Sequence, residues 1–489
     1  MHFISESIEN IILITVDCLR PDHLELYGYG KRTMPNLVQL APSGLVVDRA
    51  YTNSPFTLGS FPSLFTSSYP LEGDPFYTLR GRPDSIHEVL RGKGYRTAGF
   101  NANLYLSLIR DYERGFDFYW SPIRAEEAKS QGFNGLRDVV LKIARNLYRR
   151  IEGSPKLIDT AGSIPLLRNI VYSLTEAGVG YARAEEITRR AVNWIREHGK
   201  RPFFLWIHYM DVHNPYFVGD DLRRAGKPSY FIKEQELVRR SHELYSSRRR
   251  LTVDQESKEM LIKMKGIYDE RIRKVDANIG KLIKVLEEEN LIGSTALILT
   301  SDHGQGFLEH GFYSHGAYFY EEVLRVPLII SLLRGSSGYE RIKGDRSLMD
   351  IPPTILALLG EMYSFYRGKS LLDDNDKDII HSEALHNEKG TPISSMDDSR
   401  EVRITIAVKK GNMKYIVQFR GSETLYEELY DLERDRYEVE DLSKGGNYTD
   451  ILEEFRKEVS THMRVVGIDP AKVLHKFRLR KLRRKIASR

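Results

Sequence analysis

Four apolar runs with the form of buried strands alternate with helical patterns along most of this chain. The runs are NIILITVD (10–17), YRTAGFN (95–101), PFFLWIHYMD (202–211) and ALILTSDHG (296–304). Continuous apolar runs of this length are typical of parallel strands that helices cover on both faces. The alternation therefore predicts an α/β fold with a mostly parallel central sheet.

Polar side chains that can bind a metal stand at or just past the carboxyl ends of three of these runs. They are Asp17 in the first run, Asp211 and the nearby His213 in the third, and Asp302 and His303 in the fourth. Open α/β sheets build their sites at this edge. Carboxylates together with imidazoles suit a divalent cation such as Mn²⁺, Zn²⁺, Mg²⁺ or Ca²⁺. A single acid after a strand is more often a helix N-cap, so the metal prediction depends on three strand ends acting together.

Two regions depart from the alternation. A helical insertion over 123–180 interrupts it, and near the C-terminus ITIAVKKGNMKYIVQF followed by TDILEEFRKEV indicates antiparallel strands and a helix. Helical spacing also runs through about residues 255–290. We predict a catalytic domain over 1–380 that carries the insertion, an α+β subdomain over 381–465, and a basic tail over 466–489.

The net charge of +5 comes from the tail. Residues 472–489 hold nine Lys or Arg and no acid, which leaves the rest of the chain at −4. We therefore expect no specific nucleic-acid partner. The single cysteine, Cys18, excludes a disulfide framework, and the apolar stretch before Asp17 indicates a strand rather than a signal peptide. We expect a cytoplasmic protein, although an exported protein without disulfides would have the same composition.

Two basic stretches could contact a membrane. Within the insertion, residues 136–151 place Leu, Val and Ile on one narrow helical face and Lys and Arg on the opposite one. Such a helix can lie on an anionic membrane surface, but it can equally dock on the catalytic domain as a lid, which we expect here. The tail 472–489 has no equally clean face and is expected to be solvated, with a peripheral membrane contact, an RNA contact or a partner site as the alternatives.

Six segments resemble, in the same order, the landmarks of the sulfatase family. They are VDCLRPDHLELYGYGKRTMPNLVQLAPSGLVVDRAYTNSPFTLGSFPSLFTSSYP (16–70), GYRTAGF (94–100), PFFLWIHYMDVHNPY (202–216), TSDHGQGFLEHGFYSHGAYFYEEVLRVPLII (300–330), SLMDIPPTILALLG (347–360) and EELYDLERDRYEVEDLS (427–443). The resemblance implies the alkaline-phosphatase-like α/β/α sandwich with a small C-terminal α+β subdomain. It also implies a metal-dependent enzyme that acts on a phosphate or sulfate ester.

A threonine stands at the position of this family's nucleophile. Sulfatases place Cys or Ser there, in a C/S-x-P-x-R pattern, and oxidise it to formylglycine, whereas the equivalent residues here run from Thr57 to Phe61. Threonine is not a substrate of that modification, and the Pro and Arg of the pattern are missing as well. The Lys and His with which the family grips sulfate are also absent from the matching stretch, Asn101 to Tyr105. Formylglycine is therefore not expected.

Threonine at this position resembles the phosphodiesterases and the phosphoglycerol or phosphoethanolamine transferases of the same superfamily. That resemblance assigns one metal ion to Asp17, Thr57, Asp302 and His303. Coordination would lower the pKa of the Thr57 hydroxyl and make it a nucleophile. Thr57 could also be a helix N-cap, and the two roles are compatible because a helix N-terminus helps to hold an anionic ester. His208 is expected to support the ligands rather than to bind the metal.

The resemblance assigns Asp211, His213 and His315 to the substrate. His213 and His315 would be catalytic, since they could donate hydrogen bonds to the oxygens of the transferring group or protonate the leaving group. A purely structural alternative is that Asp211 pairs with His213. One metal is preferred to two, because two-metal relatives have a histidine where Pro215 stands here.

The main functional prediction is a metal-dependent hydrolase or transferase of phosphate esters with Thr57 as nucleophile. The first alternative is a sulfatase that works without formylglycine. The second is a catalytically inactive scaffold that binds partners through its insertion and tail, although the retained ligand types Asp17, Asp302 and His303 argue against it. Family analogy suggests a small-molecule, glycan or lipid-headgroup ester as substrate.

Overall fold

The four predicted strands lie next to one another at the centre of one sheet. β1 (Asn10–Val16), β3 (Arg96–Asn101), β5 (Phe203–Tyr209) and β6 (Thr295–Thr300) are parallel, in the order β6-β1-β5-β3. Every residue of β1, β5 and β6 is buried, as their continuous apolar sequences require. The computed structural model describes residues 8–40, 44–73, 76–106, 111–121, 181–333, 339–361, 365–373, 379–393 and 401–475.

Further strands extend this sheet on both sides. The order is β11-β2-β10-β6-β1-β5-β3-β4, with β9 paired to β2, and β10 runs antiparallel to both of its neighbours. The added strands are β2 (Gly44–Tyr51), β4 (Phe118–Trp120), β9 (Arg325–Val326), β10 (Leu328–Ser331) and β11 (Glu340–Ser347). The predicted mixed, mostly parallel sheet is confirmed.

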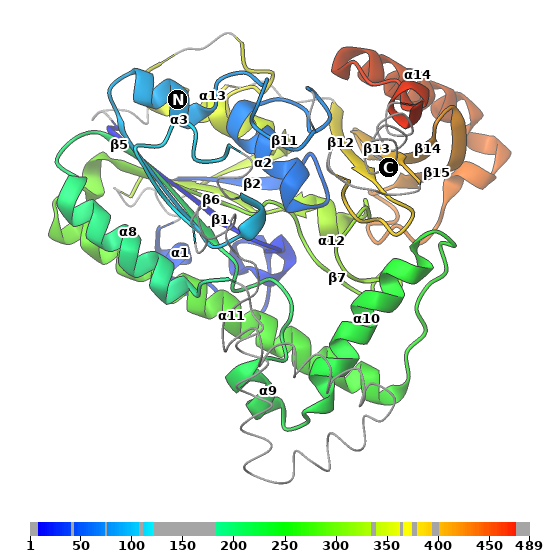
Figure 1. Cartoon of the computed structure of the whole chain (residues 1–489), viewed down its shortest axis with the longest axis horizontal. Helices are drawn as coiled ribbons and strands as arrows, with labels where there is room; N and C mark the ends of the chain where they lie inside the picture. Colours follow the sequence, from blue (N-terminus) through cyan, green and yellow to red (C-terminus); the bar gives the residue numbers. More distant parts are fainter. Residues whose placement is uncertain are drawn as a thin grey trace, which may run out of the picture.

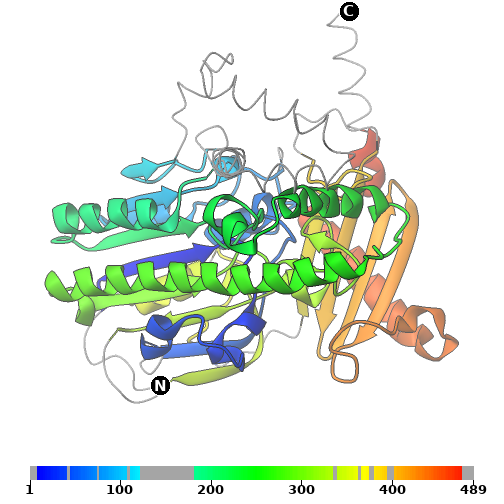
Figure 2. The same ribbon diagram turned by 90° about the horizontal axis from the view of Figure 1, so that it is seen from below.

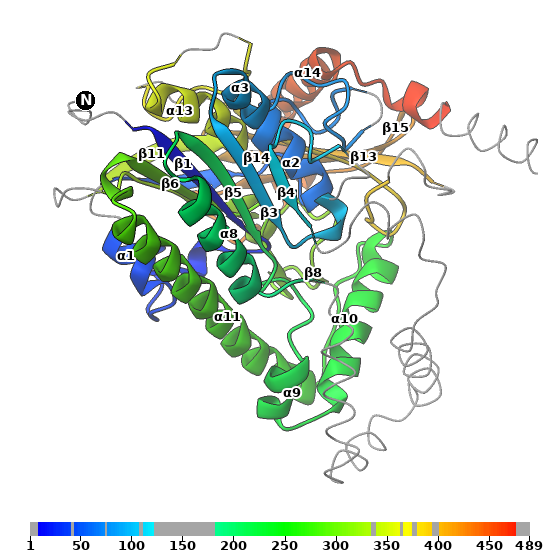
Figure 3. The same ribbon diagram turned by 60° about the vertical axis from the view of Figure 1, so that its left-hand side comes forward.

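Helices cover both faces of the central sheet, as Figure 3 shows. One layer contains α1 (Pro35–Leu40), α8 (Ala184–His198) and α11 (Gln255–Glu288), and the other contains α2 (Thr57–Thr66), α3 (Ile86–Gly92) and α13 (Ile351–Leu358). Side chains of β1 alternate between the two cores: Ile12 and Ile14 belong to the first, and Ile11 and Leu13 to the second. The predicted α/β/α sandwich and the long helix near 255–290 are thus confirmed.

A second sheet near the C-terminus is antiparallel throughout. It comprises β12 (Ile379–His386), β13 (Arg403–Lys410), β14 (Met413–Arg420) and β15 (Glu423–Asp431) in chain order. The sheet stands beside the central sheet, and α14 (Thr449–Val466) packs against it (Figures 1 and 2). The two predicted C-terminal strands and the helix after them are present as β13, β14 and α14.

Short elements and one longer helix connect the two sheets at the carboxyl edge of the central one. They are α9 (Gly219–Ala225), α10 (Ser229–Tyr245), β7 (Gly306–Phe307), β8 (Tyr313–Ser314) and α12 (Glu321–Leu324). The predicted insertion over 123–180, with its basic helix 136–151, and residues 476–489 of the tail lie outside the described residues. No helix in the described part of the chain is long and apolar enough to cross a membrane.

Candidate active site

Strand ends bring the predicted metal ligands to one edge of the central sheet. β1 lies between β5 and β6 in parallel register, so Asp17 after β1 and the pair Asp302 and His303 after β6 become neighbours. Thr57 is the first residue of α2, and the N-terminus of that helix reaches the same edge. Asp17, Asp302 and His303 are fully buried, and Thr57 is 7% exposed.

The four side chains face one another at short range. Thr57 Oγ1 lies 3.4 Å from Asp17 Oδ2 and 3.3 Å from His303 Nε2. His303 Nε2 lies 3.7 Å from Asp17 Oδ1 and 3.5 Å from Asp302 Oδ2. Two carboxylates, an imidazole nitrogen and a hydroxyl thus converge, as the ligands of one divalent cation would.

Unsatisfied polar atoms show that a cation would fit there. Asp302 Oδ2 and His208 Nε2 are buried without a hydrogen-bond partner among the described residues. Burial and the Asp17 carboxylate raise the pKa of Asp302. Burial also acts to raise the pKa of Asp17, but the neighbouring imidazoles, His213 foremost, hold it well below its ordinary value. A cation would stabilise both carboxylates in their charged form and so satisfy this arrangement.

His208 from β5 reaches the same carboxylates. Its Nε2 lies 3.5 Å from Asp17 Oδ2, without the alignment of a hydrogen bond. Its Nδ1 lies 2.9 Å from Thr15 Oγ1, which also accepts a hydrogen bond of 3.0 Å from Trp206 Nε1. These contacts fix the ring with Nε2 facing Asp17 and Asp302, so His208 is a candidate fifth ligand.

Other neighbours orient the cluster. His303 Nδ1 donates to the carbonyl of Gly304 at 2.9 Å, which leaves the Nε2 lone pair facing the carboxylates. Asn103 Nδ2 donates to Asp17 Oδ2, and Cys18 Sγ donates to Asp17 Oδ1, each at 3.2 Å. Burial and the Asp17 carboxylate raise the pKa of the Cys18 thiol well above its ordinary value, so it remains a protonated donor.

His213 and His315 lie beside the cluster with their rings 5.0 Å apart, and the His315 ring is 4.4 Å from that of His303. His213 Nδ1 donates to the carbonyl of Asn214, which leaves Nε2 for a ligand. His315 Nδ1 lies 3.3 Å from Gln305 Oε1. Burial and the other two imidazoles hold the pKa of His315 well below its ordinary value. A neutral His315 can donate one hydrogen bond to an anionic ester.

Asp211 does not join the other predicted site residues. Its carboxylate is 2% exposed and accepts a hydrogen bond from the backbone N–H of Ala184 at the start of α8. Burial raises the pKa of Asp211 to about 6. Among the described residues no hydrogen bond or ion pair joins its side chain to His213. Asp211 therefore supports the contact between β5 and α8. The substrate role that the sequence predicts for Asp211 stays a prediction.

Sequence reasoning did not single out Asn103 or Gln305. Asn103 belongs to the stretch 101–105, which lacks the Lys and His of the family. This difference from the family pattern was the only sequence feature that pointed to the region of Asn103. The amide of Asn103 meets Asp17 because β3 and β1 flank β5 in the sheet. Gln305 follows His303 by two residues and contacts His315 only because the chain turns back through β7 and β8.

Comparison with known proteins identifies the family. Residues 9–361 match the family model described as Sulfatase. The chain belongs to the sulfatase family, within the alkaline phosphatase superfamily. An arylsulfatase of Clostridium perfringens is 26% identical, with 92% of this chain and 93% of the relative aligned. Arylsulfatase K of Canis lupus familiaris is 23% identical, with 89% of this chain and 79% of the relative aligned.

Solved structures share the fold. The phosphonate monoester hydrolase of Agrobacterium radiobacter superposes with a TM-score of 0.64 at 16% identity, over 94% of this chain and 96% of its own. A protein solved in complex with its substrate D-glucosamine-2-N,6-O-disulfate superposes with a TM-score of 0.62 at 15% identity, over 95% and 99%. The alkaline-phosphatase-like fold predicted from the sequence is confirmed.

Family membership makes the protein a sulfatase-like hydrolase of sulfate or phosphate esters. Members of the family are typically metal-dependent, and the converging ligands described above are a candidate metal site. Between the predicted substrates, the names of the relatives favour the sulfate-ester alternative over the phosphate-ester prediction.

Proposed function

We propose that this protein hydrolyses sulfate or phosphate esters with unmodified Thr57 as its nucleophile. The observation that carries the proposal is the position of the Thr57 hydroxyl, which faces Asp17 and His303 at the start of a helix. A cysteine or serine for conversion to formylglycine does not stand there; the single cysteine, Cys18, precedes it by 39 positions and contacts Asp17 instead.

A divalent cation held by Asp17, Thr57, Asp302 and His303, with His208 as a further candidate ligand, would lower the pKa of the hydroxyl and stabilise charge on the ester. Thr57 would attack the central atom of the ester. The hydroxyl proton has an acceptor at hand in a carboxylate oxygen of Asp17 at 3.4 Å, whereas the lone pair of His303 Nε2, 3.3 Å from the hydroxyl, would be used to bind the cation. The N-terminus of α2 favours the negative charge of the bound ester.

His213 and His315 would act on the oxygens of the transferring group. Both rings lie next to the cluster, and among the described residues no hydrogen bond or ion pair joins either of them to Asp17 or Asp302. His315 could donate a hydrogen bond to a non-bridging oxygen. His213, whose Nδ1 hydrogen is used by Asn214, could donate from Nε2 only in its protonated form, and in that form it could also deliver a proton to the leaving group. Water would then release the group from Thr57.

The chemistry of Thr57 favours phosphorus as the central atom. Formylglycine hydrate has a second hydroxyl, so it can expel sulfate by returning to the aldehyde, whereas threonine has one hydroxyl and no such route. A group bound to Thr57 can leave only by direct attack at its central atom. Phosphate esters, and diesters in particular, are therefore the first candidate substrates.

Sulfate esters are the second candidate, and one observation favours them. The relatives named above are arylsulfatases that align with most of this chain. In that case Thr57 would carry a sulfate group, which water would remove by attack at sulfur. The same four ligands and two histidines would serve this reaction.

Paired aryl substrates test the proposal. The full chain, saturated in turn with Mn²⁺, Zn²⁺, Mg²⁺ and Ca²⁺, is assayed on an aryl phosphodiester, the phosphate monoester and the sulfate ester of the same phenol. We expect metal-dependent turnover with the phosphodiester fastest. Faster sulfate turnover would transfer the assignment to the second candidate, and no turnover of any of the three with any metal would contradict the proposal.

Replacing His213 or His315 by alanine should lower turnover by about 10²- to 10³-fold, the usual cost of removing one donor that stabilises a transition state. Metal content should not change, because neither ring contacts Asp302 or Thr57 among the described hydrogen bonds. Turnover and bound metal are measured together with thermal unfolding. A variant that unfolds at a much lower temperature would indicate a structural role for that histidine instead.

A further inference from the structure

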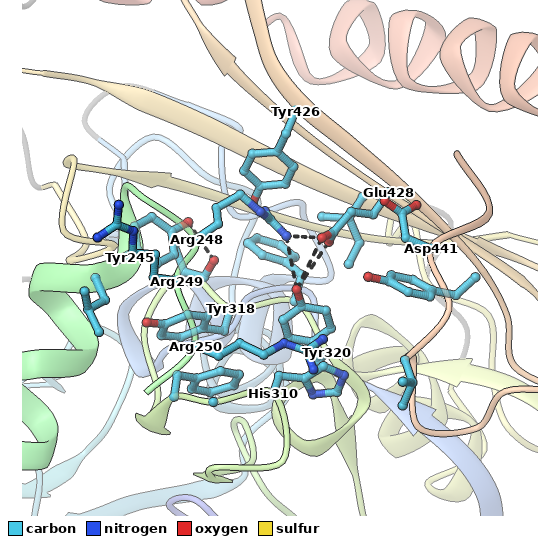
Figure 4. A pocket seen from close by; sticks show the side chains of 18 of the residues that line it. Tyr245, Arg248, Arg249, Arg250, His310, Tyr318, Tyr320, Tyr426, Glu428 and Asp441 are labelled. Carbon is cyan, nitrogen blue, oxygen red and sulfur yellow. Dashed lines mark hydrogen bonds and ion pairs between the residues drawn. The ribbon is translucent and has the colours of Figure 1, made fainter. Parts of the chain in front are cut away.

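A cavity of about 430 Å³ lies apart from the candidate active site, between the end of α10 and the C-terminal sheet (Figure 4). Its walls come from three places: residues 244–250, the segment 310–320, and strands β14 and β15 with the chain that follows them. None of the candidate metal ligands lines it. We call it the α10 cavity. Its volume is within the range of sites that hold small molecules.

Tyrosines dominate the walls of the α10 cavity. They are Tyr245, Tyr318, Tyr320, Tyr426 and Tyr430. Stacking holds two of them in place: the Tyr318 ring lies parallel to that of Phe312 at 3.6 Å, and the Tyr320 ring lies parallel to that of His310 at 3.8 Å. A wall of fixed rings offers flat apolar faces, and the phenolic hydroxyls add donors and acceptors.

Arg248 stands in the middle of the cavity in a fixed position. Its guanidinium carbon lies 3.6 Å from the centre of the Tyr426 ring. The same guanidinium pairs with Glu428 and donates a hydrogen bond of 3.2 Å to the hydroxyl of Tyr320. Figure 4 shows these groups pointing toward one another from opposite walls. The interior is therefore built from partners that hold each other and need no ligand to order them.

The two arginines that follow are different. All three arginines are exposed and line the cavity, but in the described part of the chain neither Arg249 nor Arg250 has an ion-pair partner. Lys444 adds a third cation at the rim, where it pairs with Asp441 at 3.3 Å. The rim therefore has two positive charges without an ion-pair partner among the described residues, beside an interior in which the charges of Arg248 and Glu428 balance.

This combination selects a class of ligand. Tyrosine faces suit the apolar C–H faces of a sugar ring, and the carboxylates of Glu428 and Asp441 with the phenolic hydroxyls suit its hydroxyl groups. The guanidinium groups of Arg249 and Arg250 suit an attached sulfate or carboxylate. A polyphosphate is disfavoured, because Glu428 and Asp441 would repel its several charges. A neutral sugar would leave Arg249 and Arg250 without a role.

We propose that the α10 cavity binds an acidic sugar unit, with its ring against the tyrosines and its anionic group on one of the two rim arginines, Arg249 or Arg250. The segment 310–320 connects this cavity to the candidate active site. His315 lies beside His303 in the active site, and Tyr318 and Tyr320 line the cavity. The cavity would thus hold part of a larger saccharide beside the catalytic centre. Binding there does not require that the proposed reaction take place.

Calorimetric titration of the full chain tests the proposal with four probes: a sulfated disaccharide, a uronate-containing disaccharide, a neutral disaccharide and inorganic sulfate. The two acidic disaccharides should bind, and the sulfated and uronate probes separate the two sources of negative charge. Weak binding of the neutral disaccharide and of inorganic sulfate is expected. Equal binding of inorganic sulfate would indicate a simple anion patch, and failure of both acidic disaccharides to bind would equally overturn the proposal.

The double variant Arg249→Ala/Arg250→Ala is tested with whichever acidic disaccharide the wild-type protein binds more tightly. Its affinity should be lower by about tenfold or more, because charge-assisted hydrogen bonds are lost. Arg201→Ala is the matched control, because Arg201 is exposed, lies outside the cavity and has no ion-pair partner among the described residues. Turnover of a small aryl ester should be the same in all three proteins. Unchanged affinity in the double variant would contradict the proposal, whereas absent turnover with intact binding would count only against the proposed reaction.

Discussion

Replacing Thr57 by alanine is expected to abolish turnover of both phosphate and sulfate esters. The substitution removes the hydroxyl that lies 3.4 Å from Asp17 Oδ2 and 3.3 Å from His303 Nε2, and no other hydroxyl within the described residues occupies that position. Without it the ester has no nucleophile on the protein. The loss is measured as kcat on the paired aryl substrates, with metal content determined in the same sample.

Thr57→Ser is the control for this experiment. It keeps the hydroxyl and loses only the methyl group that restricts χ1, so partial activity should remain. In a quenched reaction of the wild-type protein, a mass increase should map to the peptide that contains Thr57. Full activity in Thr57→Ala would contradict the nucleophile assignment, and so would a modified peptide elsewhere in the chain.

Asp302→Asn should remove most metal binding and most activity, because a neutral amide is a poorer ligand than a carboxylate. The metal-free variant should be no less stable than the metal-free wild type. Burial and Asp17 raise the pKa of Asp302, so the ionised carboxylate destabilises the metal-free fold once the pH exceeds the unfolded-state pKa. Bound metal, kcat and thermal unfolding with and without a chelator are the measurements.

Asp211→Asn is the matched control, since Asp211 is also a buried acid after a central strand but lies away from the cluster. It should retain metal and kcat. Loss of metal in both variants would mean that the cluster is not the binding site. A raised KM in Asp211→Asn with unchanged metal would support the substrate role that the sequence predicts for Asp211.

Local sequence determined the parts of the site that depend on strand ends. A buried parallel strand is largely apolar on both faces, so an acidic residue after an apolar run marks the end of the strand. That rule places Asp17, Asp302 and His303 at one edge of the sheet without further knowledge, because parallel neighbours end on the same side. The threonine in place of the formylglycine precursor is likewise visible from residue identity alone.

Tertiary structure decided which side chains face the site. His208 and Asp211 come from the same strand and its end, yet His208 meets Asp17 while Asp211 contacts the start of α8. Successive side chains of a strand point to opposite faces of the sheet. Which face carries the site and which is covered by α8 is decided only when the helix packs against the sheet. The positions of Asn103 and Gln305 depend on contacts between distant segments. The α10 cavity depends on the meeting of α10, the segment 310–320 and the C-terminal sheet. Such contacts have no local pattern, since their energy comes from groups that are far apart in the chain.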